Sequence, residues 1–375
     1  MKDSFLSKLL KFCAVIFLLY LFLVSINLMG HAFKGFGSDF AEGLIKTTSN
    51  PFIALFIGIL ATSLIQSSST TTSIVVGMVA SGTLTVPCAI PIVMGANIGT
   101  SVTNTLVSFA HITRKDEFKR AFAGALVHDI FNLSSVAILF PLELATHFLE
   151  KTAGIMSSTF SSSAAFKCVS PVKIIIKPVI KIIEQGVNVV FGQGAVISYT
   201  FMLILSFIIL FISLFFIVKL MKVLVIGKTE QVISGVLGRS GILGIAMGCL
   251  FTAIVQSSSV TTSLLIPMTG AGIVSLEQIM PITLGANLGT TVTAILAALA
   301  GSEAGVTIAF VHLLFNICGI VIFYPIRRMR NFCLGTARFI AVKSAESKKY
   351  ALLYVLGIFF IIPILLIFVS KLFLR

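Results

Sequence analysis

The sequence of 375 residues has few charged side chains and no tryptophan. Only 11% of its residues are charged, compared with roughly 25% in an average soluble domain, whereas 57% are hydrophobic. This composition excludes an ordinary soluble domain and indicates a protein embedded in a lipid bilayer. Residues 51–110 contain no charged side chain at all, and residues 241–300 contain only Glu277.

Several kinds of chemistry are also missing. The six cysteines have no paired spacing, and four of them lie within apolar segments, so neither a disulfide framework nor a metal site is indicated. The sequence contains no nucleotide-binding loop and no nucleophile beside a candidate base. We therefore expect a protein that is not an enzyme, needs no cofactor and holds no transition metal.

Basic residues exceed acidic ones, 27 against 13, which gives a formal net charge of +14. In a soluble protein this surplus would suggest a nucleic-acid partner. In a membrane protein it is explained by the lysines and arginines of cytoplasmic loops. We therefore expect no nucleic-acid partner.

Seven apolar stretches are long enough to cross a bilayer as helices, which takes about 20 residues each. They lie near residues 12–29, 87–110, 121–140, 198–221, 276–300, 304–326 and 350–370. Because an open sheet leaves backbone groups unpaired in lipid, we expect an all-α polytopic protein of the cell membrane, plasma or inner. No cleavage site follows the first stretch, which is therefore expected to be a retained span.

The sequence does contain an internal duplication. Residues 66–73 recur 190 positions later as residues 256–263, and both segments begin with Gln-Ser-Ser-Ser. The same offset relates residues 91–103 to residues 281–293, each of which contains Gly-Ala-Asn followed by Gly-Thr one residue later. Duplicated polar segments within apolar sequence are typical of the binding site of a secondary transporter built from two repeats.

The charges of the loops indicate that these repeats are inverted. The loop at residues 111–120 contains four basic residues, whereas its counterpart at residues 300–306 contains none. Since cytoplasmic loops are enriched in Lys and Arg, the two loops lie on opposite faces and the N-terminus lies in the cytoplasm. The expected organisation is an N-terminal span with its connector (1–50), repeat 1 (51–142), a long connection with a central span (143–240), an inverted repeat 2 (241–326), and a basic loop with a C-terminal span (327–375).

Each Gln-Ser-Ser-Ser block lies near the middle of an apolar stretch, at residues 52–82 and 242–274. Both stretches exceed one span, yet two full spans would need about 40 residues. We therefore expect two re-entrant helical hairpins with the polar blocks at their tips. The glycines and asparagine of residues 95–100 and 285–290 predict a broken transmembrane helix in each repeat.

A neutral site of this kind suits a cation and an oxyanion bound together. Hydroxyl and amide N–H groups donate to an oxyanion, whereas hydroxyl, amide and carbonyl oxygens suit hard cations. Sodium bound beside the anion would offset the cost of desolvating it. The predicted oxyanion ligands are Ser67, Ser68, Ser69, Ser257, Ser258 and Ser259. The predicted sodium ligands are Gln66, Asn97, Thr100, Gln256, Asn287 and Thr290.

Other polar residues leave two interpretations open. His128 and His312 occupy equivalent positions and could face the site, although hydrogen bonds between helices are favoured. Asp129, whose counterpart is Leu313, could serve the site or pair with the basic loop. A lysine stripe at Lys173, Lys177 and Lys181 could be an anion funnel, but an amphipathic helix on the membrane surface is favoured.

At the duplicated blocks the sequence resembles the type II sodium–phosphate cotransporter family. Residues 66–69 and 256–259 are similar to its paired Gln-Ser-Ser-Ser signatures, and residues 95–100 and 285–290 to its Gly-Ala-Asn elements. The resemblance covers roughly residues 50–142 and 240–326. It implies sodium-coupled symport of inorganic phosphate into the cell by alternating access, with both signatures contributing to one substrate and sodium site, in a compact bacterial member.

Two alternatives remain at this point. The same cage could carry another small oxyanion, sulfate or a carboxylate. In a different class, the blocks could pack helices or line a pore, in a structural membrane module or a channel. The sodium stoichiometry stays open, and the sequence is compatible with a homodimer of independent transport units.

Overall fold

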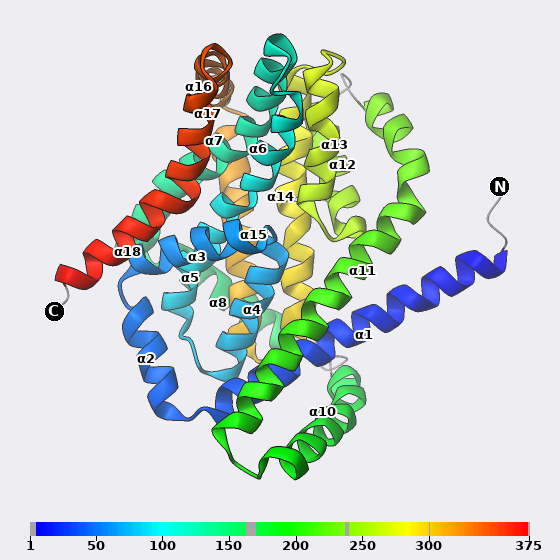
Figure 1. Cartoon of the computed structure of the whole chain (residues 1–375), viewed down its shortest axis with the longest axis vertical. Helices are drawn as coiled ribbons and strands as arrows, with labels where there is room; N and C mark the ends of the chain where they lie inside the picture. Colours follow the sequence, from blue (N-terminus) through cyan, green and yellow to red (C-terminus); the bar gives the residue numbers. More distant parts are fainter. Residues whose placement is uncertain (1–4, 163–169, 237–239, 300, 374–375) are drawn as a thin grey trace.

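A computed structural model describes residues 5–162, 170–236, 240–299 and 301–373 of the protein. Every regular element in these ranges is a helix, as expected for an all-α protein (Figure 1). Cys168 and the side chain of Lys173 lie outside the described residues. The apolar spans account for this architecture, because only a helix satisfies all of its own backbone groups within lipid.

The helices of the two duplicated halves follow one another in the same order. The first half contains α3 (Pro51–Ile65), α4 (Ser68–Ser81), α5 (Val86–Thr100), α6 (Val102–Ser108), a 3-10 turn (Phe109–His111) and α7 (Lys115–Thr146). The second half contains α12 (Gly241–Val255), α13 (Ser258–Gly270), α14 (Leu276–Leu299) and α15 (Glu303–Phe323). The remaining helices are α1 (Phe5–Gly35), α2 (Ser38–Thr48), α8 (Phe148–Ser162), α10 (Ser170–Phe191), α11 (Val196–Val236), α16 (Arg327–Glu346), α17 (Lys348–Leu356) and α18 (Ile362–Phe373), with a π turn (Gly357–Ile361) between the last two.

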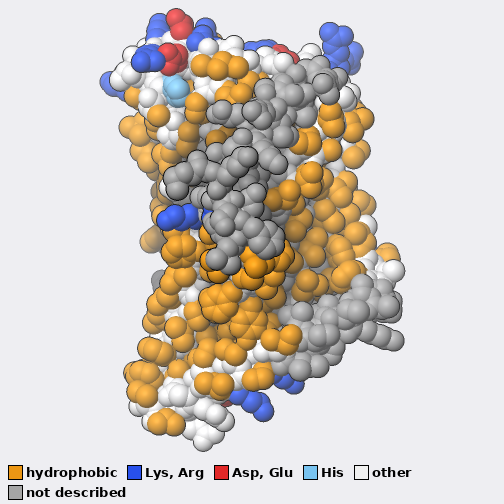
Figure 2. Space-filling view, turned by 90° about the vertical axis from the view of Figure 1, so that its right-hand side faces the viewer, with side chains coloured by type: hydrophobic (Ala, Val, Ile, Leu, Met, Phe, Trp, Pro, Cys, Tyr) orange, Lys and Arg blue, Asp and Glu red, His pale blue; other side chains and the backbone are white. Residues whose placement is uncertain are grey.

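Seven helical segments among the described residues are long and apolar enough to cross a membrane, and they coincide with the seven predicted stretches. They are Leu9–Gly35, Val86–His111, Lys115–Thr146, Val196–Leu220, Leu276–Leu299, Glu303–Phe323 and Lys348–Ser370. The pair α2 and α3, bent by 98° at its break, would make an eighth span if counted as one. In Figure 2, hydrophobic side chains cover most of the visible middle of the molecule, and most charged ones gather toward its ends.

Both predicted hairpins are present. The turn between α3 and α4 and the turn between α12 and α13 each fall on a Gln-Ser pair, Gln66-Ser67 and Gln256-Ser257. The polar blocks therefore lie at the hairpin tips, as predicted. Re-entry of these hairpins into the membrane, and the inversion of the two repeats, stay predictions.

The predicted break in the second half is wrong, because α14 runs without interruption through residues 285–290. In the first half the helix is interrupted only at Ser101, between α5 and α6, directly after the predicted residues 95–100. The glycines serve close helix packing instead. A side chain at Gly95 would collide with the backbone carbonyl of Leu55 on α3, and one at Gly285 with that of Ile245 on α12.

The same packing recurs from the hairpin side. A side chain at Gly58 would collide with the carbonyl of Ile92, and one at Gly248 with that of Ile282. Small residues let helix backbones approach closely inside membranes, and this contact offsets the cost of about 1 kcal/mol that glycine imposes on a helix. In each half, the first hairpin helix is thereby held against the neighbouring span.

Candidate functional site

The hairpin tips have unusual and nearly identical backbone geometry. Gln66 has φ 58° and ψ 26°, and Gln256 has φ 60° and ψ 25°. Each backbone N–H donates to the carbonyl four residues earlier, Thr62 or Thr252, at 2.7 Å. Among the described residues only one other non-glycine, His147, has a positive φ. Left-handed conformations of this kind cost free energy and cluster at functional sites.

The serine after each glutamine caps the second helix of its hairpin. Ser67 Oγ accepts the N–H of Thr70 at 3.2 Å, and Ser257 Oγ accepts the N–H of Val260 at 3.3 Å. These bonds are typical N-caps and satisfy one free donor in the first turn of each helix. Ser67 and Ser257 therefore have a structural role, while the hydrogen of each hydroxyl can still be donated.

Threonine pairs fasten each hairpin just behind its tip. The hydroxyls of Thr62 and Thr71 lie 3.0 Å apart, and those of Thr252 and Thr261 lie 2.6 Å apart. The two pairs occupy equivalent positions in the two halves. The duplicated polar residues thus build two copies of one local structure.

The two tips meet at a single pocket of about 230 Å³. Both Gln-Ser-Ser-Ser blocks line it together with four residues of α11. Its lining residues are Ile65, Gln66, Ser67, Ser68, Ser69, Thr70, Phe211, Leu214, Phe215, Val218, Gln256, Ser257, Ser258 and Ser259. The structure therefore brings together all six predicted oxyanion ligands and two of the predicted sodium ligands.

Four helix ends, two from each hairpin, converge on this pocket. Helices α4 and α13 begin there, with Ser68 and Ser258 buried in their first turns, while α3 and α12 end there. A helix N-terminus carries free N–H groups and partial positive charge, and a C-terminus carries free carbonyls and partial negative charge. The pocket is smaller than the 300 Å³ or more typical of sites for drug-sized ligands, and it has no charged lining residue. It suits a small anion and a cation.

The other predicted sodium ligands lie outside the lining of this pocket. Thr100 and Thr290 are buried, and their hydroxyls donate to the carbonyls of Ala96 and Ala286, at 2.9 and 3.1 Å. Asn97 and Asn287 are also buried and take part in a network of polar side chains between helices.

This network connects the two halves reciprocally. His128 on α7 contacts Asn287 Oδ1 through Nε2 at 2.6 Å, and His312 on α15 contacts Asn97 Oδ1 through Nε2 at 3.4 Å. Each histidine thus meets the asparagine of the other half. Asn132 joins them, because its side-chain amide donates to the carbonyl of Asn97 at 2.7 Å and its oxygen accepts from Asn287 at 2.6 Å. The interpretation of the histidines as interhelical hydrogen-bonding residues is supported.

A second link was not found from the sequence. Asn104 Oδ1 accepts from Thr262 of α13 at 2.7 Å, and its amide nitrogen lies 3.0 Å from Nδ1 of His128. Ala294 stands at the position equivalent to Asn104. The asymmetry of this pair removed the duplication signal that identified the other polar residues.

Asp129 is buried beside the network and is held by hydroxyls. Its carboxylate accepts hydrogen bonds from Ser101, at 3.0 Å, and from Tyr354 of α17. The alternative in which Asp129 pairs with the basic loop is not found in the described part of the chain, where Arg114 instead pairs with Glu117 at 2.9 Å. The Tyr354 contact ties the C-terminal span to the core.

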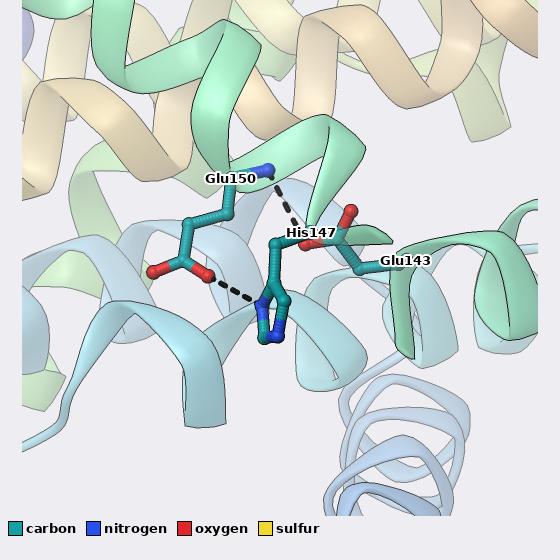
Figure 3. A group of neighbouring side chains, drawn as sticks. All are labelled: Glu143, His147 and Glu150. Atoms are coloured by element: carbon teal, nitrogen blue, oxygen red, sulfur yellow. Dashed lines mark hydrogen bonds and ion pairs between the residues drawn. The ribbon is translucent and has the colours of Figure 1, made fainter. Parts of the chain in front are cut away.

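Among the described residues, one group of acidic and histidine side chains, Glu143, His147 and Glu150, has the spacing of a metal site (Figure 3). The carboxylate of Glu143 accepts the backbone N–H groups of Leu149 at 2.6 Å and Glu150 at 3.2 Å, and His147 Nδ1 lies 2.9 Å from Glu150. The two bonds to Glu143 cap the start of α8 where it meets α7. The group is explained as a helix corner.

Comparisons with known proteins point to one family. A family model described as Na+/Pi-cotransporter matches residues 21–140 and 209–342. Sodium-dependent phosphate transport protein 2B of Homo sapiens is 35% identical over 436 residues, which cover 92% of this chain and 63% of the relative. Protein 2A of Rattus norvegicus is 35% identical over 435 residues, which cover 97% of this chain and 68% of the relative. The chain therefore spans about two thirds of the length of these relatives. No solved structure gives a significant match.

Proposed function

The chain belongs to the Na+/Pi-cotransporter family, and on that premise we propose that it carries inorganic phosphate into the cell together with sodium ions. The observation that carries this proposal is the single neutral pocket at which both Gln-Ser-Ser-Ser blocks meet. The names of the relatives supply the substrate, and the pocket supplies a place where a small oxyanion and a cation fit.

In the proposed site, phosphate lies at the beginnings of α4 and α13. Its oxygens accept hydrogen bonds from the serine hydroxyls and from the first N–H groups of both helices. Two helix N-termini pointing at one anion provide fixed positive potential without a basic side chain.

In the proposed site, sodium lies at the C-terminal ends of α3 and α12, on the other side of each tip from phosphate. The side-chain oxygens of Gln66 and Gln256 and the last carbonyls of α3 and α12 are the kind of ligand that hard cations prefer. Two unit charges about 4 Å apart attract each other by about 4 kcal/mol at an effective dielectric constant of 20. Each bound ion therefore raises the affinity for the other, which is the coupling that a symporter needs.

We further propose alternating access by two inverted repeats moving about this site, with the N-terminus in the cytoplasm of a cell-membrane protein. The support is the equivalence of the two hairpins and the reciprocal histidine and asparagine contacts. Catalysis and a cofactor are not needed for this cycle. The proposed assembly is a homodimer in which each subunit transports independently.

Purified protein in liposomes tests this function. An inward sodium gradient should drive accumulation of labelled phosphate, and replacing sodium with potassium should abolish it. Arsenate should inhibit strongly because it copies the shape and charge of phosphate, whereas sulfate and succinate should not. Uptake that is equal in potassium, or that never exceeds the outside concentration, would contradict the proposal. Inhibition by sulfate or succinate rather than arsenate would favour another oxyanion.

A further inference from the structure

A separate pocket of about 310 Å³ lies between α7, the turn after α13 and α16, away from the hairpin tips. Three basic side chains line it, those of Lys119, Arg120 and Arg338. The rest of its wall is mainly apolar and includes Ala123, Val274 and Val342. Basic residues on an apolar hollow suit a ligand that has both an anionic group and a hydrocarbon part.

The basic side chains keep positive charge available to a ligand. Arg120 donates its Nε to the carbonyl of Gly270 at 2.8 Å, which holds the guanidinium in place and leaves its two terminal NH2 groups. Arg338 forms an ion pair with Glu277, and both are about half exposed. Three positive side chains against this one negative partner leave two positive charges. Arginine forks match the geometry of phosphate oxygens.

The pocket lies where a membrane surface would meet the protein. Figure 1 places α16 and the end of α13 at the same end of the molecule, and Figure 2 shows charged side chains gathered at that end above the hydrophobic middle. Helix α16 itself exposes Phe332 and Phe339 beside its arginines. Exposed aromatic and basic side chains on one helix are typical of helices at the membrane interface.

We propose that this pocket binds one anionic phospholipid. Its phosphate contacts Lys119, Arg120 and Arg338, and an acyl chain follows the apolar wall toward Val342. Basic pockets between helices bind such headgroups on the cytoplasmic side of membrane proteins, which is the side predicted for this end. Inorganic phosphate shares the anionic chemistry but gains nothing from the apolar wall. The proposal does not depend on the transport function.

Native mass spectrometry of the full chain in detergent, titrated with phosphatidylglycerol or phosphatidylcholine, tests the site. The wild type should bind one phosphatidylglycerol in preference to phosphatidylcholine. A Lys119→Gln, Arg338→Gln double variant should bind phosphatidylglycerol about 25-fold more weakly, since each basic residue near a membrane surface contributes about fivefold. The matched control is Lys343→Gln, which removes a lysine of the same helix that pairs with Glu346 and does not line the pocket.

A Val342→Phe variant keeps every charge and fills the hollow, and because Val342 is 40% exposed the larger side chain should not disturb folding. It too should weaken phosphatidylglycerol binding. Equal binding of the two lipids by the wild type would overturn the proposal, as would an unchanged affinity in the double variant or in Val342→Phe. If Lys343→Gln lowers the affinity for phosphatidylglycerol as much as the double variant does, the lipid is attracted by the general surface charge and not by this pocket, which would also overturn the proposal. Displacement of the lipid by millimolar inorganic phosphate would assign the pocket to the free ion.

Discussion

At the scale of single residues, the two hairpin-tip glutamines are equivalent in backbone and different in side chain. Gln256 is buried, and its side-chain oxygen accepts from Thr293 at 2.8 Å. Gln66 is exposed, and Thr103, the counterpart of Thr293, has a buried hydroxyl for which the described residues provide no partner. The two glutamines therefore differ in burial and in hydrogen bonding, although their backbones are the same.

This difference predicts unequal stability effects. Gln256→Ala should lower the free energy of unfolding by about 1–3 kcal/mol, because it leaves the buried Thr293 hydroxyl unpaired. Gln66→Ala should change it by less than about 0.5 kcal/mol, as exposed substitutions usually do. Thermal unfolding in detergent measures both. Equal losses in the two variants would contradict the observed asymmetry.

The buried asparagines predict a second contrast. Asn287 is held by short bonds of 2.6 Å to His128 and Asn132, whereas the contacts of Asn97 Oδ1 with His312 and Asn316 are both 3.4 Å long. Asn287→Ala should therefore destabilise the protein by about 2–4 kcal/mol, since two buried groups lose their partner. Asn97→Ala should destabilise it less. The sodium dependence of transport, measured on the same variants, tests the predicted sodium role, and normal sodium affinity in both would remove these residues from the site.

At the scale of helices, the sequence predicted positions better than shapes. Apolar length and the Gln-Ser-Ser-Ser interruptions correctly located the seven spans and both hairpin turns, because these follow from local composition. The glycines of residues 95–100 and 285–290 were misassigned as helix breaks. Their role depends on the carbonyls of Leu55 and Ile245, which lie on other helices and cannot be seen in a single local pattern.

The packing role of these glycines can be tested directly. Gly248→Val should prevent α12 from seating on α14, because any side chain there collides with the backbone of Ile282. We expect loss of the monodisperse peak in size-exclusion chromatography, or destabilisation by about 1–3 kcal/mol or more, the cost of an overpacked core. Gly335→Val is the control, since space is open at that position of α16. A Gly248→Val protein as stable as this control would contradict the packing.

Two lysines of the predicted stripe line a pocket of about 540 Å³ at the far end of α4 from Ser68. Lys177 and Lys181 face it together with Lys34, while His31 pairs with Glu184 at 3.1 Å. The anion funnel and the membrane-surface helix both stay predictions. The two interpretations differ in whether these lysines increase the rate at which phosphate reaches the protein.

If the pocket steers anions, Lys177→Gln with Lys181→Gln should lower kcat/KM for phosphate several-fold at low ionic strength. Added choline chloride at constant sodium should remove the difference, because salt at 1 M shortens electrostatic range to about 3 Å. Lys151→Gln, outside the pocket, is the control. A deficit that persists unchanged in high salt would favour a structural role for the stripe.

At the scale of the whole molecule, what could not be predicted is how distant segments meet. Duplication identified the polar residues that line the pocket at the two tips, but the meeting of both tips with Phe211 and Phe215 of α11 depends on packing across the chain. The bond of Asp129 to Tyr354 likewise joins segments 225 positions apart. Neither the residues of α11 nor Tyr354 belong to a motif that would identify these contacts from the sequence. The duplication therefore predicts the polar lining of the pocket, whereas its apolar wall and the contacts that support it depend on tertiary packing.

The central claim is that phosphate binds where the two tips meet. Equilibrium binding of labelled phosphate to the purified protein, with and without sodium, tests it most directly. Ser68→Ala and Ser258→Ala should each weaken phosphate binding in sodium about ten- to a hundred-fold, because a donor to a charged ligand contributes about 1.5–3 kcal/mol. Ser81→Ala, at the other end of α4, should bind normally. If both tip variants bind phosphate and sodium with wild-type affinity, the site lies elsewhere.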